Sequence, residues 1–210
     1  MSNCPACHAE LETPLACGAC SALIDGAGSL DPFAIFGLVR GWTIDQQDLS
    51  QRLRRFGRLM HPDYYAAAGD AARELAEDNT AALNEAHELL SDDFRRADWL
   101  VRALGGPGES DERQMPQAFL MEVLEWNETL DDARNAAGGG PERTELEGLG
   151  QTLDTERAAT MERIGAGLTP LPDDGSTALT ALRRELNAIR YLDRARRELK
   201  SLRLDDATAR

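Results

Sequence analysis

Apolar residues recur at helical spacing in several segments of the chain. A helix turns about 100° per residue, so positions i, i+4, i+7 and i+11 lie on one stripe. The first clear segment, 49–60, carries such a stripe, formed by Leu49, Leu53, Phe56 and Met60. The opposite side of the same segment carries the basic residues Arg54, Arg55 and Arg58. The pattern predicts a helix with one packing face and one cationic face.

The tripeptide His61-Pro62-Asp63 follows this helix directly. Pro62 has no amide hydrogen and pushes His61 out of the helical region of backbone space. We therefore expect the helix to stop there and to present His61 and Asp63 in a constrained turn. Thr43, with Gln46 three residues later, has the spacing of a capping box and predicts where the helix begins.

Three further helices are predicted around this one. Residues 29–38 read as a brief helix that buries Phe33, Phe36 and Leu38, and a fourth short helix begins near Asp92. A longer helix is predicted between about 70 and 90, where helical spacing is kept by Leu75, Asn79, Ala82, Leu83, Ala86 and Leu90. This helix should run antiparallel to the basic helix across the His-Pro-Asp turn.

Beyond a linker rich in glycine and proline at 105–115, three more helical patterns follow. They are predicted at 116–137, 142–165 and 176–204. Clusters of glycine and proline interrupt them, and short connections between amphipathic helices favour an antiparallel three-helix bundle. The predicted fold class is therefore all-α.

The first helix of this bundle has two apolar faces. One is a seam at i, i+4, i+7 and i+11, formed by Phe119, Val123, Trp126 and Leu130. The second is an apolar strip rimmed with acid, made up of Leu120, Met121, Leu124, Glu125, Glu128 and Asp132. Position alone leaves two interpretations of the second strip: further packing inside the protein, or a surface that binds another protein.

Composition narrows the possible partners. The net charge of −14 over 210 residues repels phosphate backbones and anionic membranes, so nucleic acid and membrane are not expected partners. No apolar run approaches the length of a membrane span, and the N-terminus lacks a signal or transit pattern, so a cytoplasmic location is expected. The cationic helix face is a local exception that suggests steering toward an acidic patch on another protein.

All four cysteines lie near the N-terminus in two CxxC pairs nine residues apart: Cys4, Cys7, Cys17 and Cys20. Four thiolates suit a tetrahedral structural Zn²⁺ site, and Gly18 is expected to permit the tight backbone of the second pair. Iron ligation remains open, because spacing does not separate it from zinc. A redox pair and disulfides are less favoured, because too little chain precedes Cys4 for a βαβ unit and the chain is expected in the cytosol.

The predicted helices and the tripeptide resemble the J domain of co-chaperones that dock on DnaK-class (70-kDa heat-shock) ATPases. The resemblance covers FAIFGL at 33–38, LNEAHELL at 83–90 and the basic pair Arg95-Arg96. His87 stands where an aromatic residue is usual, and Tyr64 where a basic residue is common. The resemblance implies a chaperone-binding set of His61, Pro62, Asp63, Arg54, Arg55 and Arg58.

Residues 119–131, FLMEVLEWNETLD, and 189–193, IRYLD, resemble the C-terminal bundle of HscB-type co-chaperones of iron–sulfur cluster assembly. The four-cysteine module is similar to that of mitochondrial members of the family. In this family the bundle holds the cluster scaffold protein while the J domain engages the chaperone. The implied client-binding set is Leu120, Met121, Leu124, Glu125, Glu128, Asp132 and Tyr191, with Asp132 in place of a longer acid.

The resemblance thus implies a zinc module at 1–28, a J domain at 29–104, a linker at 105–115 and a client-binding bundle at 116–210. It implies a co-chaperone that is not itself an enzyme, with a DnaK/HscA-class chaperone and an iron–sulfur cluster scaffold protein as partners. Two alternatives remain: a zinc-containing J-domain or regulatory adaptor with another client, and an oxidoreductase that uses a CxxC thiol.

Overall fold

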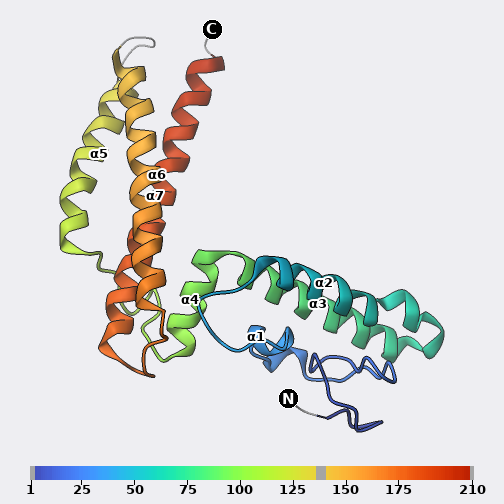
Figure 1. Ribbon diagram of the computed structural model, residues 1–210. Helices are drawn as coiled ribbons and strands as arrows, with labels where there is room; N and C mark the ends of the chain where they lie inside the picture. Colours follow the sequence, from blue (N-terminus) through green and yellow to red (C-terminus); the bar gives the residue numbers. More distant parts are fainter. Residues whose placement is uncertain (1–2, 136–140, 209–210) are drawn as a thin grey trace. The chain divides into compact units, whose positions relative to one another are not determined.

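The computed structural model describes residues 3–135 and 141–208, with side chains described except at 27, 132–145 and 203–208. Over these residues its secondary structure is helical, in agreement with the predicted class (Figure 1). The chain forms two compact units, Met1–Arg96 and Ala97–Arg210, and the division between them along the chain falls within helix α4 (Asp93–Ala103). No helix among the described residues is long and apolar enough to cross a membrane.

A helical hairpin forms the centre of the first unit. Helices α2 (Gln46–Leu59) and α3 (Asp70–Ser91) lie side by side, joined by the 3₁₀ helix η2 (Pro62–Ala68) (Figure 1). The side chains buried between them and the short helix α1 (Pro32–Ile35) include Phe33, Phe36, Leu49, Phe56, Met60, Leu83, Ala86 and Leu90. The predicted hairpin and its packing stripe are thus confirmed.

The start of α2 differs from the expected capping box. Asp45 is the N-cap, and its carboxylate accepts hydrogen bonds from the amides of Gln47 and Asp48 at 2.8 and 3.1 Å. A carboxylate at this position satisfies two amides and complements the positive end of the helix dipole, which explains why Asp45 rather than Thr43 fills the role.

A small module at residues 3–24, held together by isolated β-bridges, packs against the hairpin. Its interior includes the buried side chains of Cys4, Leu11, Leu15 and Cys17. The fully buried Asn79 of α3 donates from Nδ2 to the carbonyl oxygens of Leu15 and Ile24 at 2.9 and 3.0 Å. The short 3₁₀ helix η1 (Ala27–Ser29) follows the module.

At Gly37 the chain after α1 passes close to the backbone of the module. Its φ of +63° lies in the left-handed region, and a Cβ at this position would stand 2.5 Å from the carbonyl oxygen of Glu12. Only glycine therefore allows the chain after α1 to approach the module backbone this closely.

The second unit contains the predicted antiparallel bundle of α5 (Gln117–Asn135), α6 (Pro141–Gly167) and α7 (Thr177–Thr208). Helices α6 and α7 share the most extensive packing, and α5 lies alongside them (Figure 1). The core is aliphatic with a few aromatic side chains, and includes Phe119, Val123, Trp126, Leu130, Leu153, Ile164, Leu186 and Leu192.

A buried ion pair joins α4 to α7 within this unit. The guanidinium of Arg183 is fully buried, with Nη1 2.5 Å from Oδ1 of Asp98 and Nε donating to the carbonyl of Pro107 at 2.8 Å. Arg102 and Arg190 lie around the same carboxylate, at 3.0 and 3.5 Å.

Candidate functional site

The four cysteines come together as predicted. Their Sγ atoms all lie within 4.8 Å of one another, with 3.7 Å between Cys4 and Cys20 and 3.6 Å between Cys7 and Cys17. All four are free cysteines in this structure, and these two distances are far longer than the roughly 2.05 Å of a disulfide bond. A tetrahedral Zn–S site with bonds of about 2.3 Å has sulfur–sulfur edges of about 3.8 Å, so the cluster has the size of a four-thiolate metal site.

The two CxxC pairs form equivalent knuckles. In each, the amide of the residue after the second cysteine donates to the carbonyl of the first: His8 to Cys4 and Ser21 to Cys17, both at 2.9 Å. These two residues have φ values of 62° and 58°. The expectation for Gly18 was wrong: its φ lies outside the left-handed region, because the tight turn falls one residue after each pair.

The backbone of the second knuckle also favours the ionised form of the Cys17 thiol. Hydrogen bonds from the amides of Cys20 and Ala19 lower the pKa of the Cys17 thiol to about 7. The amide of Ala22 favours the Cys20 thiolate as well, but the neighbouring thiols and burial outweigh it and raise the pKa of Cys20 to about 12. Four thiols this close cannot all ionise without a cation between them, so the cluster fits a bound metal ion.

His61 and Asp63 are exposed at the turn after α2. The Nδ1 atom of His61 accepts from the amide of Asp63 at 3.3 Å, and the histidine ring lies edge-on to Tyr64, 6.0 Å away. The side chains of His61 and Asp63 are 53% and 86% exposed, so neither contributes to the core. His61 is the N-cap of η2, and Pro62 and Asp63 are its first two residues, so the triplet directly follows the end of α2.

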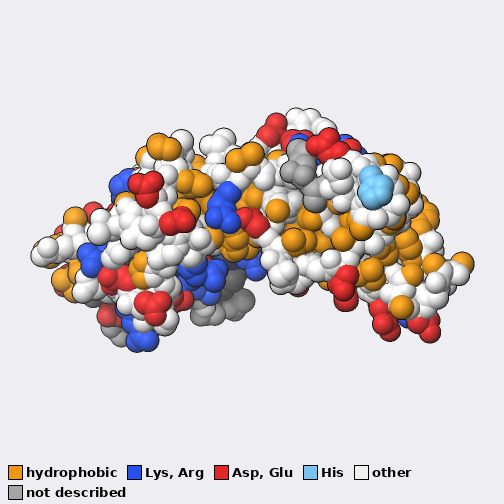
Figure 2. Space-filling model, turned by 90° about the horizontal axis from the view of Figure 1, so that it is seen from below, with side chains coloured by type: hydrophobic (Ala, Val, Ile, Leu, Met, Phe, Trp, Pro, Cys, Tyr) orange, Lys and Arg blue, Asp and Glu red, His pale blue; other side chains and the backbone are white. Residues whose placement is uncertain are grey.

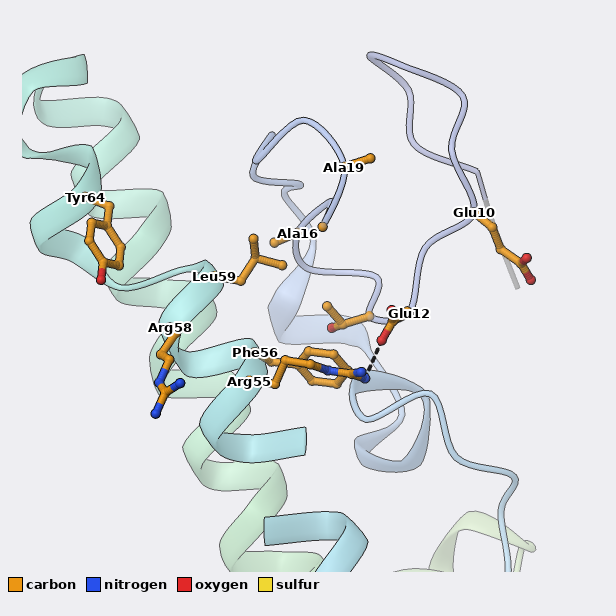
Figure 3. Close-up of a pocket in the computed structure, with 11 residues that line it drawn as sticks. Glu10, Glu12, Ala16, Ala19, Arg55, Phe56, Arg58, Leu59 and Tyr64 are labelled. Carbon is orange, nitrogen blue, oxygen red and sulfur yellow. Dashed lines mark ion pairs between the residues drawn. The ribbon is translucent and has the colours of Figure 1, made fainter. Parts of the chain in front are cut away.

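The cationic face of α2 is also exposed, and its three arginines differ in their contacts. Among the described residues, Arg54 and Arg58 have no ion pair, whereas Arg55 pairs with Glu12 of the module. A cavity of about 630 Å³ lies between this face and the module. Figure 3 shows Arg55 reaching Glu12 across it and Leu59 pointing towards Ala16.

Figure 2 shows charges of both signs scattered among apolar side chains on the face that it displays, without one large positive area. This distribution accords with the net charge of −14 and leaves the α2 arginines as a local feature. A local cationic face next to an exposed turn suits a protein partner better than a nucleic acid.

The second apolar strip of α5 is exposed. Leu120, Met121 and Leu124 are 43%, 68% and 60% exposed, while the seam on the other side of the helix is buried. Glu125 and Glu128 are exposed beside them. Packing inside the described part of the chain therefore does not account for these three side chains, which form what we call the α5 patch. The side chain of Asp132 lies outside the described residues.

Tyr191 of α7 lies at the edge of α5. Its ring is 5.9 Å from that of Phe119, edge-on, and its hydroxyl donates to Oδ1 of Asn127 at 2.8 Å. Burial raises the pKa of Tyr191, which keeps the hydroxyl protonated as a donor. Asn127 lies between the seam and the α5 patch on the helix, so Tyr191 borders the side of α5 on which the patch begins.

Three residues near these sites make contacts that the sequence pattern does not predict. Tyr65 and Asn79 join the module to the hairpin, and Asn127 holds Tyr191. Each bonds to a residue distant in sequence, which helical periodicity does not reveal. The tyrosine beside the His-Pro-Asp turn and the asparagine within a helical stripe were the available hints.

Comparisons with known proteins agree with this architecture. A family model described as the HSCB C-terminal oligomerisation domain matches residues 115–200. The co-chaperone protein HscB homolog of Burkholderia thailandensis is 34% identical over 145 residues, 69% of this chain and 81% of the relative. The homolog of Bordetella avium is 38% identical over 130 residues, 61% and 74% of the two chains.

Two solved structures share the fold. The crystal structure of the human co-chaperone protein HscB superposes with a TM-score of 0.72 at 20% identity, covering 94% of this chain and 96% of the human chain. Chaperone HscB from Vibrio cholerae gives a TM-score of 0.66 at 21% identity, covering 84% and 99%.

Proposed function

The chain belongs to the HscB family of co-chaperones, and we propose that it stimulates ATP hydrolysis by a DnaK/HscA-class chaperone and delivers an iron–sulfur cluster scaffold protein to it. The observation that carries this proposal is the presence, in one chain, of two surfaces that the described residues leave exposed. One is the His-Pro-Asp turn with the cationic face of α2, and the other is the α5 patch.

In this proposal residues 29–104 act as the J domain. His61, Pro62 and Asp63 contact the chaperone, with Arg54, Arg55 and Arg58 steering the encounter toward an acidic surface. Arg54 and Arg58, which have no ion pair among the described residues, contribute most, because the charge of Arg55 is already offset by Glu12. ATP is hydrolysed in the partner, and this chain performs no chemistry.

Residues 116–210, which follow the linker at 105–115, act as the client-binding bundle. The scaffold would bury the α5 patch, and Glu125, Glu128, Asp132 and Tyr191 would border it. An apolar centre with a polar rim is the usual anatomy of a protein interface, and the large apolar side chains are the expected anchors.

We further propose that the N-terminal module, at 1–28, holds Zn²⁺ through Cys4, Cys7, Cys17 and Cys20. Four soft thiolates favour zinc, which would supply a structural clip here. Backbone hydrogen bonds shape the two knuckles, and Asn79 of α3 holds the chain on either side of the second one.

A reconstituted ATPase assay tests the proposal. The chaperone's steady-state rate should rise when this protein is added, and should rise further when scaffold is added to the mixture. If this protein raises the ATPase rate but adding scaffold does not raise it further, a J-domain adaptor with another client would be favoured. No change under either condition would exclude the co-chaperone proposal for that chaperone.

A further inference from the structure

One side chain connects the cysteine cluster to the His-Pro-Asp turn. The hydroxyl of Tyr65, in η2, lies 2.9 Å from the carbonyl oxygen of Ser21 and 3.0 Å from that of Leu59. Ser21 directly follows the candidate ligand Cys20, and Leu59 is the last residue of α2. A single hydroxyl thus joins the second knuckle, the end of the cationic helix and the segment that begins with Pro62.

The hydrogen bonds of the Tyr65 hydroxyl can hold this side chain in a fixed position. The last carbonyls of a helix have no partner within the helix, so the Leu59 carbonyl needs an outside donor. The Tyr65 ring is half-buried, and burial raises the pKa of its hydroxyl, which therefore remains a donor at neutral pH. The hydroxyl has one proton, shared between the two carbonyl oxygens.

The knuckle is itself held in place on the hairpin. Asn79 donates to the carbonyls of Leu15 and Ile24, on either side of the second CxxC pair. The turn that closes this pair contains Ser21, whose φ of 58° is unfavourable for a residue with a Cβ. A metal ion that gathers the four thiols would maintain that turn and the direction of the Ser21 carbonyl.

We propose that Tyr65 is a positioning residue through which the metal-bound N-terminal module holds the His-Pro-Asp turn in the arrangement that engages the chaperone. Metal occupancy then determines how well the turn is ordered, and hence how strongly the protein stimulates its partner. The effect on stimulation rests on the proposed function, whereas the effect on the turn is a property of this chain alone.

The test compares Tyr65→Phe with Tyr64→Phe. Tyr64 is the adjacent tyrosine, 73% exposed, and its hydroxyl has no hydrogen bond among the described residues. Amide hydrogen exchange over 62–68 in the free protein should become about fivefold faster in Tyr65→Phe, the effect expected from one lost hydrogen bond. The Tyr64→Phe protein should match wild type, and both variants should keep their metal.

Removing the metal with a chelator should speed exchange over 62–68 in wild type, and should add little in Tyr65→Phe, where the connection is already broken. The concentration that gives half-maximal ATPase stimulation should rise by a similar factor in Tyr65→Phe and in metal-free wild type. Unchanged exchange in Tyr65→Phe, or metal removal that acts equally in both proteins, would overturn the inference. If the wild-type protein does not stimulate the chaperone but amide exchange changes as expected, the proposed function would be refuted. The link from the metal through Tyr65 to the His-Pro-Asp turn would still hold.

Discussion

Val123 and Leu124 are neighbours on α5, yet Val123 is 8% exposed and Leu124 is 60% exposed. The step of about 100° between them turns one side chain into the bundle and the other to its surface. The same division separates Phe119 from Leu120. Helix α5 therefore has one face that stabilises the bundle and one that is available to a partner.

The α5 patch can be removed without removing the core. Changing Leu120, Met121 and Leu124 together to Ser should leave the melting temperature nearly unchanged, because these side chains are exposed. Loss of apolar anchors should weaken scaffold binding by more than about 2 kcal/mol, roughly thirtyfold in Kd. Calorimetric titration measures the affinity. As a control, Val123→Ser places a hydroxyl in the buried seam and should cost about 2–3 kcal/mol of stability.

A folded triple variant with unchanged scaffold affinity would contradict the assignment of the client site. Sedimentation of the same variant separates scaffold binding from self-association. If the triple change alters the oligomeric state and not scaffold binding, the α5 patch joins copies of this chain instead.

The pair of Asp98 and Arg183 should matter far more to stability than an exposed pair. In Asp98→Asn the guanidinium of Arg183 keeps its charge but loses its carboxylate while fully buried, which should cost about 3–5 kcal/mol in denaturant unfolding. The matched change Asp154→Asn removes an exposed partner of Arg196 and should cost less than about 1 kcal/mol. Equal losses would show that burial of the Arg183 pair is not decisive.

The cysteine cluster should contain one metal ion per chain, with zinc expected. Cys17→Ser should remove it, because three thiolates no longer complete the shell, while circular dichroism should still show the helices, whose core is separate. Metal binding should weaken as the pH falls, because protons compete for the thiolates. Elemental analysis that finds iron alone, or no metal after anaerobic purification, would refute the zinc assignment.

Local sequence patterns are sufficient to predict much of this fold. The i, i+4, i+7 stripe of α2 and the two faces of α5 were predictable because helix geometry converts spacing directly into direction. The clustering of Cys4 with Cys20 followed from paired CxxC motifs, since four close thiols need a common cation. His61 was expected to be exposed because Pro62 ends the preceding helix.

Contacts between distant segments were not predictable in this way. Asn79 has the spacing of a core position, but nothing local indicates that its amide bonds to Leu15 and Ile24. The left-handed residues His8 and Ser21 were missed because glycine is the usual signal for that conformation, and the glycine present, Gly18, lies elsewhere in the knuckle. Such features depend on which surfaces meet, which periodicity does not encode.

The most direct test of the co-chaperone account is the chaperone's ATPase rate with His61→Gln in place of wild type, in the presence of scaffold. His61 is 53% exposed, so the change should leave circular dichroism and the melting temperature almost unaltered. His87→Gln, the same substitution at a half-buried position on α3, serves as the control. We expect wild type and the folded His87→Gln protein to stimulate ATP hydrolysis and His61→Gln not to. Full stimulation by a folded His61→Gln protein would contradict the co-chaperone account.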